Sequence, residues 1–331
     1  MAINRVEIKD FMVFKGELAL DFCPGVNVFI GGNGTGKTTL LKAMYALWDV
    51  QQRVDVEKKE KWHLLAIQEY FPYFSMERSY ISKSWHDYGD VILKFSPNAK
   101  TEIFALRNVS KENNLIFIPN KDLLAHSKGF LALYHKYKMP FDKTYADILL
   151  NAELPPTLDL NINSEKLLST IETIIGGQVL DEGGIFYIIK ENGEKVPFSL
   201  EASAYQKFGL LWKLLRNGLI EDNSILLWDE PENSLNPELV PVLVDILLEL
   251  SRNGVQIFIA SHDYNFVRYF DVRVKKDISV LFHNLTKNAD GQIVCESSSN
   301  YLKLTNNLLE DSAEELFDAV IADGMRIQRN G

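Results

Sequence analysis

The chain contains very little cysteine. Cys23 and Cys295 are the only two among 331 residues, they lie far apart, and no CxxC pair occurs. Neither a disulfide framework nor a cysteine zinc site is indicated by this usage. The histidines also lack the tight spacing of metal ligands. These absences favour a protein of a reducing compartment.

Long apolar runs are missing as well. The N-terminal stretch MAINRVEIKD has charges among its first residues and no apolar signal core. The longest apolar stretches, such as LVPVLVDILLEL, carry charges and are too short to span a bilayer. We therefore expect a cytoplasmic protein with no membrane partner.

Positive charge is in the minority. The chain has 35 Lys and Arg against 45 Asp and Glu, a formal net charge of -10. This balance argues against a protein that coats nucleic acid with its whole surface. A local basic patch that binds nucleic acid is still compatible with it. Heptad runs and internal repeats are also lacking, which excludes a long coiled-coil arm.

The composition is otherwise that of a folded globular protein, with 46% hydrophobic and 24% charged residues. The N-terminal segments 5–14 and 16–22 alternate apolar and polar residues, which predicts half-buried strands of a small sheet. The segment VNVFI at 26–30 predicts a buried strand that runs into glycines. From Lys37 an apolar helical stripe follows, so strand, loop and helix come in that order.

The second half of the chain predicts an α/β arrangement. Segment 184–200 is typical of a hairpin that turns on Asn192 and Gly193. An amphipathic helix is expected at 202–218. Two apolar strands at 224–230 and 255–263 are then separated by a helix, which is the pattern of a parallel crossover unit.

The loop between the first buried strand and its helix has the chemistry of a phosphate site. It fits G-x-x-x-x-G-K-[ST], in which bare glycine backbone closes around phosphates, the lysine reaches the terminal phosphates and the hydroxyl can bind magnesium. A glycine turn before an ordinary helix is the alternative. The expected nucleotide-binding residues are Gly31, Gly32, Asn33, Gly34, Thr35, Gly36, Lys37, Thr38 and Thr39.

Two later strands end in residues that suit the same site. ILLWDE ends in Asp229 and Glu230, and IFIASHD delivers His262. Strand ends at the carboxyl edge of such sheets are where ligands bind. We expect Asp229 and Thr38 to hold the metal, Glu230 to polarise the attacking water, and His262 to contact the γ-phosphate, with Lys37 also catalytic. A lone histidine is more often structural than catalytic. The role of His262 is therefore inferred from its position, at the end of the strand that follows Asp229 and Glu230 in the chain.

Taken in order, these motifs resemble ATP-binding cassette ATPases of the AAA type, in the soluble branch with RecF, SMC heads and OLD-type proteins. GGNGTGKTT is similar to the Walker A motif, ILLWDEPENSLNP to Walker B with the D-loop, and IFIASHD to the strand of the switch histidine. The segments KDLLAHSKGFLALY and GLLWKLL resemble stand-alone bacterial members. The resemblance implies a P-loop NTPase of ABC/SMC-head type, with a mixed sheet core, an antiparallel N-terminal sheet and an inserted α/β lobe.

The resemblance also implies ATP and Mg²⁺ as ligands and a composite site shared by two copies. The matching signature segment here is EASAYQK, with Ser203 at the signature serine. A serine that caps a helix can bind a partner's γ-phosphate. Ala204 stands where the family expects glycine, so a role of Ser203 as a plain N-cap stays open.

Three domains are expected. Residues 1–53 form a nucleotide-binding lobe with the P-loop, 54–160 an inserted lobe, and 161–331 the part with the signature helix, Walker B and the switch histidine. Gln68 is a candidate for the Q-loop, and Phe14 or Lys15 for the adenine contact. Asn236 replaces the D-loop aspartate of transporters.

The expected function is Mg-dependent ATP hydrolysis that drives ATP-gated pairing into a homodimer or a higher oligomer. The resemblance implies control of a separate effector, such as a nuclease, or of a nucleic-acid process, in bacterial anti-phage defence. A slow nucleotide-gated sensor or scaffold and the ATPase subunit of a membrane transporter are the alternatives. IPNKDLL is similar to the guanine-binding NKxD motif of GTPases, but its aspartate comes one residue early, which argues against that interpretation. Because 69 residues follow His262, we expect no fused nuclease.

Overall fold

The computed structural model describes residues 2–53, 69–71, 79–85, 89–95, 102–109, 114–121, 124–137, 141–158 and 160–330. Gln68 lies outside them. Within these ranges no helix has both the length and the apolar character needed to cross a bilayer. Two hydrophobic cores lie on the two faces of a central sheet.

The strands are β1 Arg5–Lys9, β2 Glu17–Asp21, β3 Val26–Gly31, β4 Ser79–Trp85, β5 Gly89–Phe95, β6 Glu102–Val109, β7 Leu115–Ile118, β8 Gly177–Glu182, β9 Ile185–Lys190, β10 Lys195–Pro197, β11 Ile225–Asp229, β12 Gln256–Ala260, β13 Val280–Lys287 and β14 Ile293–Ser298. The α-helices are α1 Lys37–Arg53, α3 Phe130–Tyr137, α4 Lys143–Glu153, α5 Ile162–Ile175, α6 Ser203–Arg216, α7 Val240–Arg252, α8 Tyr264–Arg273 and α9 Leu308–Asn330.

The central sheet has six strands in the order β14-β13-β3-β12-β11-β7, all parallel except β14. Every residue of β3, β11 and β12 is buried. Because helices cover both faces, these strands are continuous apolar runs rather than alternating ones. Along β3, Val28 and Ile30 belong to one core and Phe29 to the other. The mixed α/β fold expected from the sequence is confirmed.

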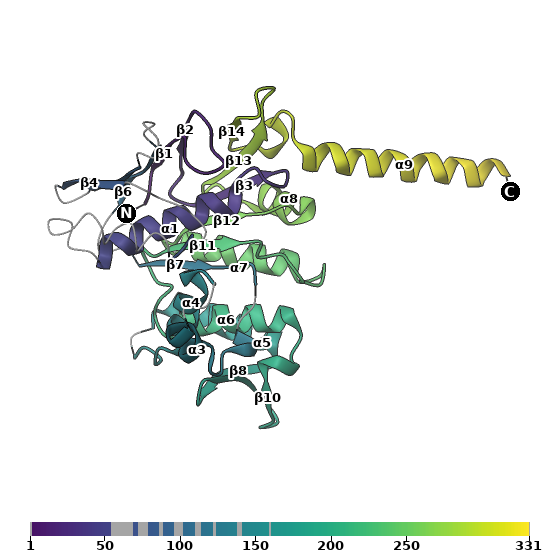
Figure 1. Cartoon of the computed structure of the whole chain (residues 1–331). Coiled ribbons are helices and arrows are strands. Elements are labelled where there is room, and N and C mark those ends of the chain that lie inside the picture. Colours follow the sequence, from purple (N-terminus) through teal and green to yellow (C-terminus); the bar gives the residue numbers. More distant parts are fainter. Residues whose placement is uncertain are drawn as a thin grey trace.

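Helix α1 and the N-terminal strands cover one face of this sheet, and α5 to α8 cover the other (Figure 1). The predicted apolar stripe of α1 is buried at Leu40, Leu41, Met44 and Leu47. Crossover helix α7 connects β11 to β12, as expected, but begins only at Val240, with Pro241 in its first turn. Proline suits that position because its missing N–H would have no helical partner there.

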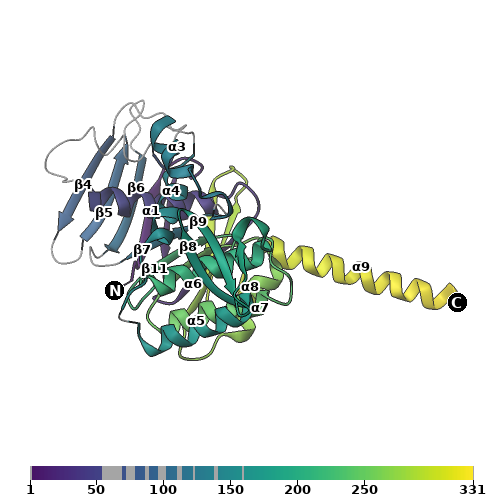
Figure 2. The same ribbon diagram turned by 90° about the horizontal axis from the view of Figure 1, so that it is seen from below.

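The expected antiparallel N-terminal sheet is present and is larger than the two predicted strands. Its order is β2-β1-β6-β5-β4, and β6 pairs with β1 through Arg107 opposite Arg5. Figure 2 shows β4, β5 and β6 side by side at one end of the molecule. Strand β7 joins the central sheet beside β11. The segment 54–160 therefore contributes strands to both sheets, and its separation as a lobe at 53 and 160 stays a prediction.

The predicted hairpin is confirmed as β9 and β10, with Gly193 in the left-handed region at φ 82°. Together with β8 it forms a three-stranded sheet against α6 (Figure 2). At the end of the chain, α9 projects away from the rest of the molecule (Figure 1).

Candidate nucleotide-binding site

The P-loop joins β3 to α1 and requires its glycines. Gly31, Gly34 and Gly36 have φ values of 135°, 73° and 89°. A Cβ on Gly31 would lie 2.1 Å from the carbonyl oxygen of Leu285, and one on Gly36 would lie 2.6 Å from the Phe14 ring. Both the backbone conformation and the close packing thus exclude larger residues. Asn33 and Gly34 are exposed at the tip of the loop.

Lys37 folds back over this loop. Its Nζ donates to the carbonyl oxygens of Gly31 at 2.7 Å and Gly32 at 3.1 Å. Burial lowers the pKa of the Lys37 ammonium, and the carboxylates of Glu230, Asp229 and Glu232 raise it. The ammonium is thus held at the sheet edge by carbonyl oxygens that a stronger anionic ligand can replace.

Thr38 and Asp229 lie 191 positions apart in the chain and come together in the fold. The hydroxyl Oγ1 of Thr38 donates to both carboxylate oxygens of Asp229, at 2.9 and 3.1 Å. Burial raises the pKa of Asp229 to about 6, and the Thr38 hydrogen bond opposes that rise. Hydroxyl and carboxylate oxygens are the donors that Mg²⁺ prefers, and this metal takes only one or two protein ligands beside phosphate and water. The residues present therefore fit a magnesium site.

Glu230 and His262 form a second pair at the same edge. His262 Nδ1 lies 3.1 Å from Glu230 Oε1, and both side chains are partly exposed, at 53% and 25%. Glu230 has φ 51° and its N–H donates to the carbonyl oxygen of Ala260 at 2.9 Å. A left-handed conformation in a residue with a Cβ costs free energy and is concentrated at functional sites. This backbone turn directs Glu230 away from the buried strand.

The expected convergence is present. Strands β3, β12 and β11 are neighbours and parallel, so the P-loop, His262, Asp229 and Glu230 all follow the carboxyl ends of adjacent strands. Thr35 is buried and its hydroxyl donates to the carbonyl oxygen of Gly32 at 2.9 Å, which stiffens the loop. Thr39 follows half-buried in α1. The catalytic and binding roles of these residues stay predictions.

Ser203 stands apart from this group. It is the first residue of α6 and is exposed, whereas the N-cap is Ala202, which makes no side-chain cap. The expectation that Ser203 caps its helix is wrong by one position, because the chain enters the helix after Ala202. Ala204, the next residue, is buried. The free N-terminus of α6 and the Ser203 hydroxyl both face the surface.

Glu232 was not singled out by the sequence pattern. Its side chain is buried, Ser261 Oγ donates to its Oε1 at 2.7 Å, and the backbone N–H of His262 donates to the same oxygen at 3.3 Å. Burial raises the pKa of this carboxyl. Glu232 thus joins the loop after Glu230 to the loop that carries His262. Its place in the acidic run DEPEN was the only signal in the sequence.

Lys207 was also missed. It is buried in the second turn of α6, and its Nζ donates to the carbonyl oxygens of Glu230, Pro231 and Asn233 at 3.4, 3.3 and 2.5 Å. A buried ammonium that binds three carbonyl oxygens fixes two elements to each other. The helix that begins with Ser203 is therefore attached to the backbone beside Glu230.

The neighbourhood of the P-loop revises the candidates for the base contact. Phe14 is fully buried with its ring against Gly36, so it supports the loop rather than offering a stacking face. Lys15 is exposed and stays a candidate. Val13 is the exposed apolar side chain beside Gly36, at 40% exposure. Asn120 lies two residues after Ile118, the last residue of β7. Because Ile118 pairs with Trp228, Asn120 lies at the same edge of the sheet as Asp229.

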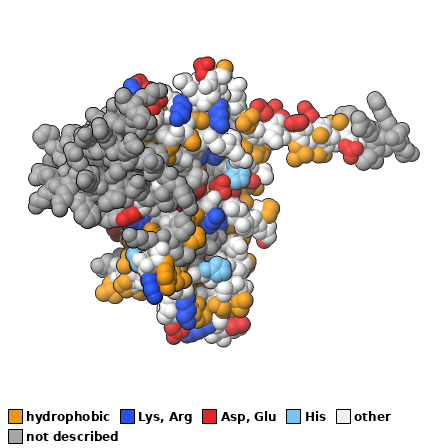
Figure 3. Space-filling model, in the orientation of Figure 1, with side chains coloured by type: hydrophobic (Ala, Val, Ile, Leu, Met, Phe, Trp, Pro, Cys, Tyr) orange, Lys and Arg blue, Asp and Glu red, His pale blue; other side chains and the backbone are white. Residues whose placement is uncertain are grey.

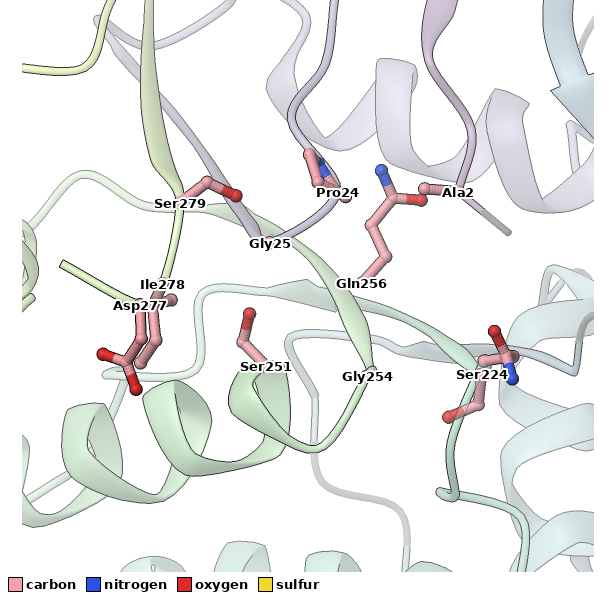
Figure 4. A pocket seen from close by; sticks show the side chains of 11 residues that line it. Ala2, Pro24, Gly25, Ser224, Ser251, Gly254, Gln256, Asp277, Ile278 and Ser279 are labelled. Carbon is pink, nitrogen blue, oxygen red and sulfur yellow. The ribbon is translucent and has the colours of Figure 1, made fainter. Parts of the chain in front are cut away.

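A cavity of about 270 Å³ lies at the opposite edge of the sheet (Figure 4). It is lined where β3, β11, β12 and β13 begin, with Gln256 pointing toward the N-terminal segment. The Gln256 side chain accepts a hydrogen bond from the N–H of Ile3 and donates to the carbonyl oxygens of Ile3 and Cys23. This cavity is therefore separate from the P-loop, which follows the other end of β3.

Residues 26–268 match the AAA_21 family, which is described as "AAA domain, putative AbiEii toxin, Type IV TA system". This span includes the P-loop, Asp229, Glu230 and His262. The chain belongs to this AAA-domain family. The resemblance to AAA-type ATP-binding cassette proteins is thereby confirmed.

Curated proteins resemble this AAA-domain chain over different lengths. The DNA replication and repair protein RecF of Lactobacillus gasseri is 55% identical over 47 residues, which are 14% of this chain and 12% of that protein. The chain therefore spans about one eighth of the RecF proteins that it matches. The glutamate transport ATP-binding protein GluA of Corynebacterium glutamicum is 24% identical over 242 residues, 71% of this chain and 89% of that protein.

Solved structures are similar at low identity. The SMC head domain from Thermotoga maritima has 14% identity and a TM-score of 0.44, over 90% of this chain and 99% of that chain. A nucleotide-free ATP-binding cassette from an ABC transporter has 14% identity and a TM-score of 0.45, over 93% and 95%. The fold class rests on the sheet topology described above, because these scores are low.

Proposed function

We propose that this AAA-domain chain is a magnesium-dependent ATPase whose ATP-bound form pairs with a second copy. The single observation that carries the ATPase proposal is the pair of contacts at one sheet edge, Thr38 to Asp229 and Glu230 to His262, beside the P-loop lysine. Together they supply a metal site, a base and a cation, which are the parts that phosphoryl transfer to water requires.

The chain's own residues divide the work. Lys37 leaves the carbonyl oxygens of Gly31 and Gly32 and binds the terminal phosphates of ATP. Thr38 and Asp229 would hold Mg²⁺, which neutralises charge on the phosphates when bound. Their hydrogen bond keeps both oxygens at one point before the metal arrives. A bound cation would favour the charged form of Asp229, because it would offset the desolvation that raises the pKa of this carboxyl.

Glu230 is the proposed general base. Its carboxyl is partly exposed and lies 3.1 Å from His262 Nδ1, so it can accept a proton from a water that attacks the γ-phosphate. His262 orients this carboxyl and contacts the γ-phosphate. Glu232 and Lys207 hold the two loops that carry these side chains.

The exposed start of α6 supports the proposed pairing. Ser203 and the free N–H groups of α6 form an anion site that the same chain leaves at its surface. In the proposed pair this site meets the γ-phosphate held on the other copy's P-loop. A slow sensor or scaffold is the second candidate, because Ala204 stands where the resemblance expects glycine and the half-buried Tyr205 follows it, which hinders close approach of a phosphate to the backbone.

The test is the Glu230→Gln variant. We expect it to bind ATP with near wild-type affinity, to lose at least 100-fold in turnover, and to accumulate as a dimer with ATP and Mg²⁺. Unchanged turnover would remove Glu230 from the reaction. A wild-type rate near background with DNA, RNA and partner proteins present would favour the sensor.

The biological setting is proposed from the family resemblance. It is bacterial anti-phage defence, in which the nucleotide state controls a separate effector such as a nuclease or a nucleic-acid process. The likeness to GluA keeps a transporter subunit as the alternative. Proteins that co-purify with Glu230→Gln in ATP, and not with Lys37→Ala, would identify the effector; a membrane permease among them would favour the transporter.

A further inference from the structure

Helix α9 leaves the body of the molecule at the P-loop. Leu308, its first residue, is the side chain that a Cβ on Gly32 would meet, at 3.2 Å. Asn284 of β13 donates to the carbonyl oxygens of Thr305 and Asn306 at 2.9 and 3.2 Å, which anchors the turn before the helix. At 1.5 Å per residue the 23-residue helix extends about 35 Å outward.

One side of α9 is apolar and exposed. Leu309, Ala313, Leu316 and Val320 recur at helical spacing and therefore share a face. Leu309 packs against the core, so this face continues outward from the body. We call the exposed part the α9 stripe. Its members are Leu316, Phe317, Val320 and Ile321, which are 40–67% exposed.

The opposite side of α9 is acidic. Exposed acidic residues lie along it at Asp311, Glu314, Glu315 and Asp318. Figure 3 shows hydrophobic side chains mainly along the lower edge of the projecting helix and most of the acidic ones along its upper edge, while one acidic side chain lies on the lower edge next to the grey end. An acidic flank repels anionic lipid surfaces and phosphate backbones, so neither a membrane nor a nucleic acid suits this helix. A protein surface does.

We propose that the α9 stripe packs against the second copy of this chain that covers the P-loop. The inference rests on the ATP-dependent pairing proposed above. Because α9 begins in contact with Gly32, a copy seated on the P-loop lies directly at the base of the helix. In Figure 1, α8 lies below the start of α9. Helix α8 follows His262, which lies at the same edge of the sheet as the P-loop. In a two-fold symmetric dimer, α9 of each copy would pack against the other copy.

The test compares two variants in the Glu230→Gln background. Leu316→Gln with Val320→Gln replaces two of the four stripe side chains, and Glu315→Gln with Asp318→Gln is the matched control on the acidic side. Glutamine is a good helix former, so both variants keep the helix. Sedimentation velocity over a concentration series gives the dimer dissociation constant with ATP and Mg²⁺. A fluorescent ATP analogue measures nucleotide affinity at concentrations where the chain is monomeric.

We expect the stripe variant to raise the dimer dissociation constant at least tenfold, with nucleotide affinity unchanged, and the control to stay within threefold of Glu230→Gln alone. Equal dimer affinity in the stripe variant would overturn the proposal and leave ATP-dependent pairing intact. A chain that stays monomeric with ATP in every variant would overturn both. A dimer that forms without nucleotide and is lost with the stripe would show that the arms pair elsewhere, against the proposal.

Discussion

Thr38 and Asp229 are separated by 191 positions in the chain, yet the Thr38 hydroxyl donates to both carboxylate oxygens of Asp229. Thr38 is the second residue of α1, the helix after β3, and Asp229 ends β11, two strands away in the same sheet. The two oxygens are thus placed together by the sheet before any ligand binds. This prearrangement lowers the ordering cost of binding a metal at this point.

The first prediction concerns the metal. Asp229→Asn keeps an oxygen that Thr38 can bond but removes the charge that attracts Mg²⁺. We expect turnover to fall at least 100-fold and the Mg²⁺ dependence of ATP binding to weaken. Binding of ATP without metal should be unchanged or tighter, because repulsion between carboxylate and phosphate is removed. Nucleotide titrations with and without Mg²⁺ measure this, and equal Mg²⁺ dependence in both proteins would contradict it.

The second prediction is the pH dependence of stability without nucleotide. The folded pKa of Asp229 is about 6, above its ordinary value near 3.8, so the folded state holds the proton more tightly than the unfolded state. The contribution of this carboxyl is therefore most favourable below about pH 4 and is lost as the pH rises through 6, by up to about 3 kcal/mol. Asp229→Asn should be more stable than wild type at pH 7, and the difference should shrink toward pH 4.

Denaturant unfolding of both proteins at pH 4, 5, 6 and 7 checks the sign. Addition of Mg²⁺ and ATP should remove the advantage of the asparagine variant, because the bound cation stabilises the charged carboxylate. A variant that is less stable than wild type at pH 7 by the same amount as at pH 4 would count against the raised pKa.

The third prediction concerns Glu232 as a positioning residue. Glu232→Gln keeps an oxygen for Ser261 and for the backbone of His262 and removes a buried charge, so we expect stability to hold and turnover to fall less than fivefold. Glu232→Ala leaves Ser261 Oγ and this N–H without the acceptor, so kcat should fall 10- to 100-fold with KM nearly unchanged. If both variants lose activity equally, the hydrogen bonds from Ser261 and His262 to residue 232 do not account for its effect on turnover.

The fourth prediction concerns the link between α6 and the loop after Glu230. Lys207→Met removes three hydrogen bonds to backbone carbonyls. We expect ATP binding to be retained, turnover to fall at least tenfold, and stability to drop by about 1–3 kcal/mol. Lys213→Met is the matched control, because Lys213 is a buried lysine of the same helix whose Nζ lies 3.5 Å from the carbonyl oxygen of Leu154 instead.

Steady-state kinetics and thermal unfolding of the two lysine variants separate these effects. A loss of turnover that is the same in Lys213→Met would show that any buried lysine of α6 has this effect through stability alone. Normal turnover in Lys207→Met would remove the link from the mechanism.

The sequence by itself determined the local chemistry. The spacing of glycines, Lys37 and Thr38 predicted the P-loop because only that backbone and those side chains can close on a phosphate. The apolar runs that end in Asp229 and His262 predicted buried parallel strands, since a strand covered on both faces has no polar alternation. The family resemblance followed from these motifs in their order.

Only the tertiary structure decided which groups support that chemistry. Glu232 and Lys207 act through contacts with Ser261 and with loop carbonyls that lie 23 to 29 positions away, and no local pattern encodes such distances. The pairing of β6 with β1 and the anchoring of α9 beside Gly32 are also long-range. Side-chain spacing fixes what a segment can become, whereas its neighbours in space are set by how all segments bury their apolar faces together.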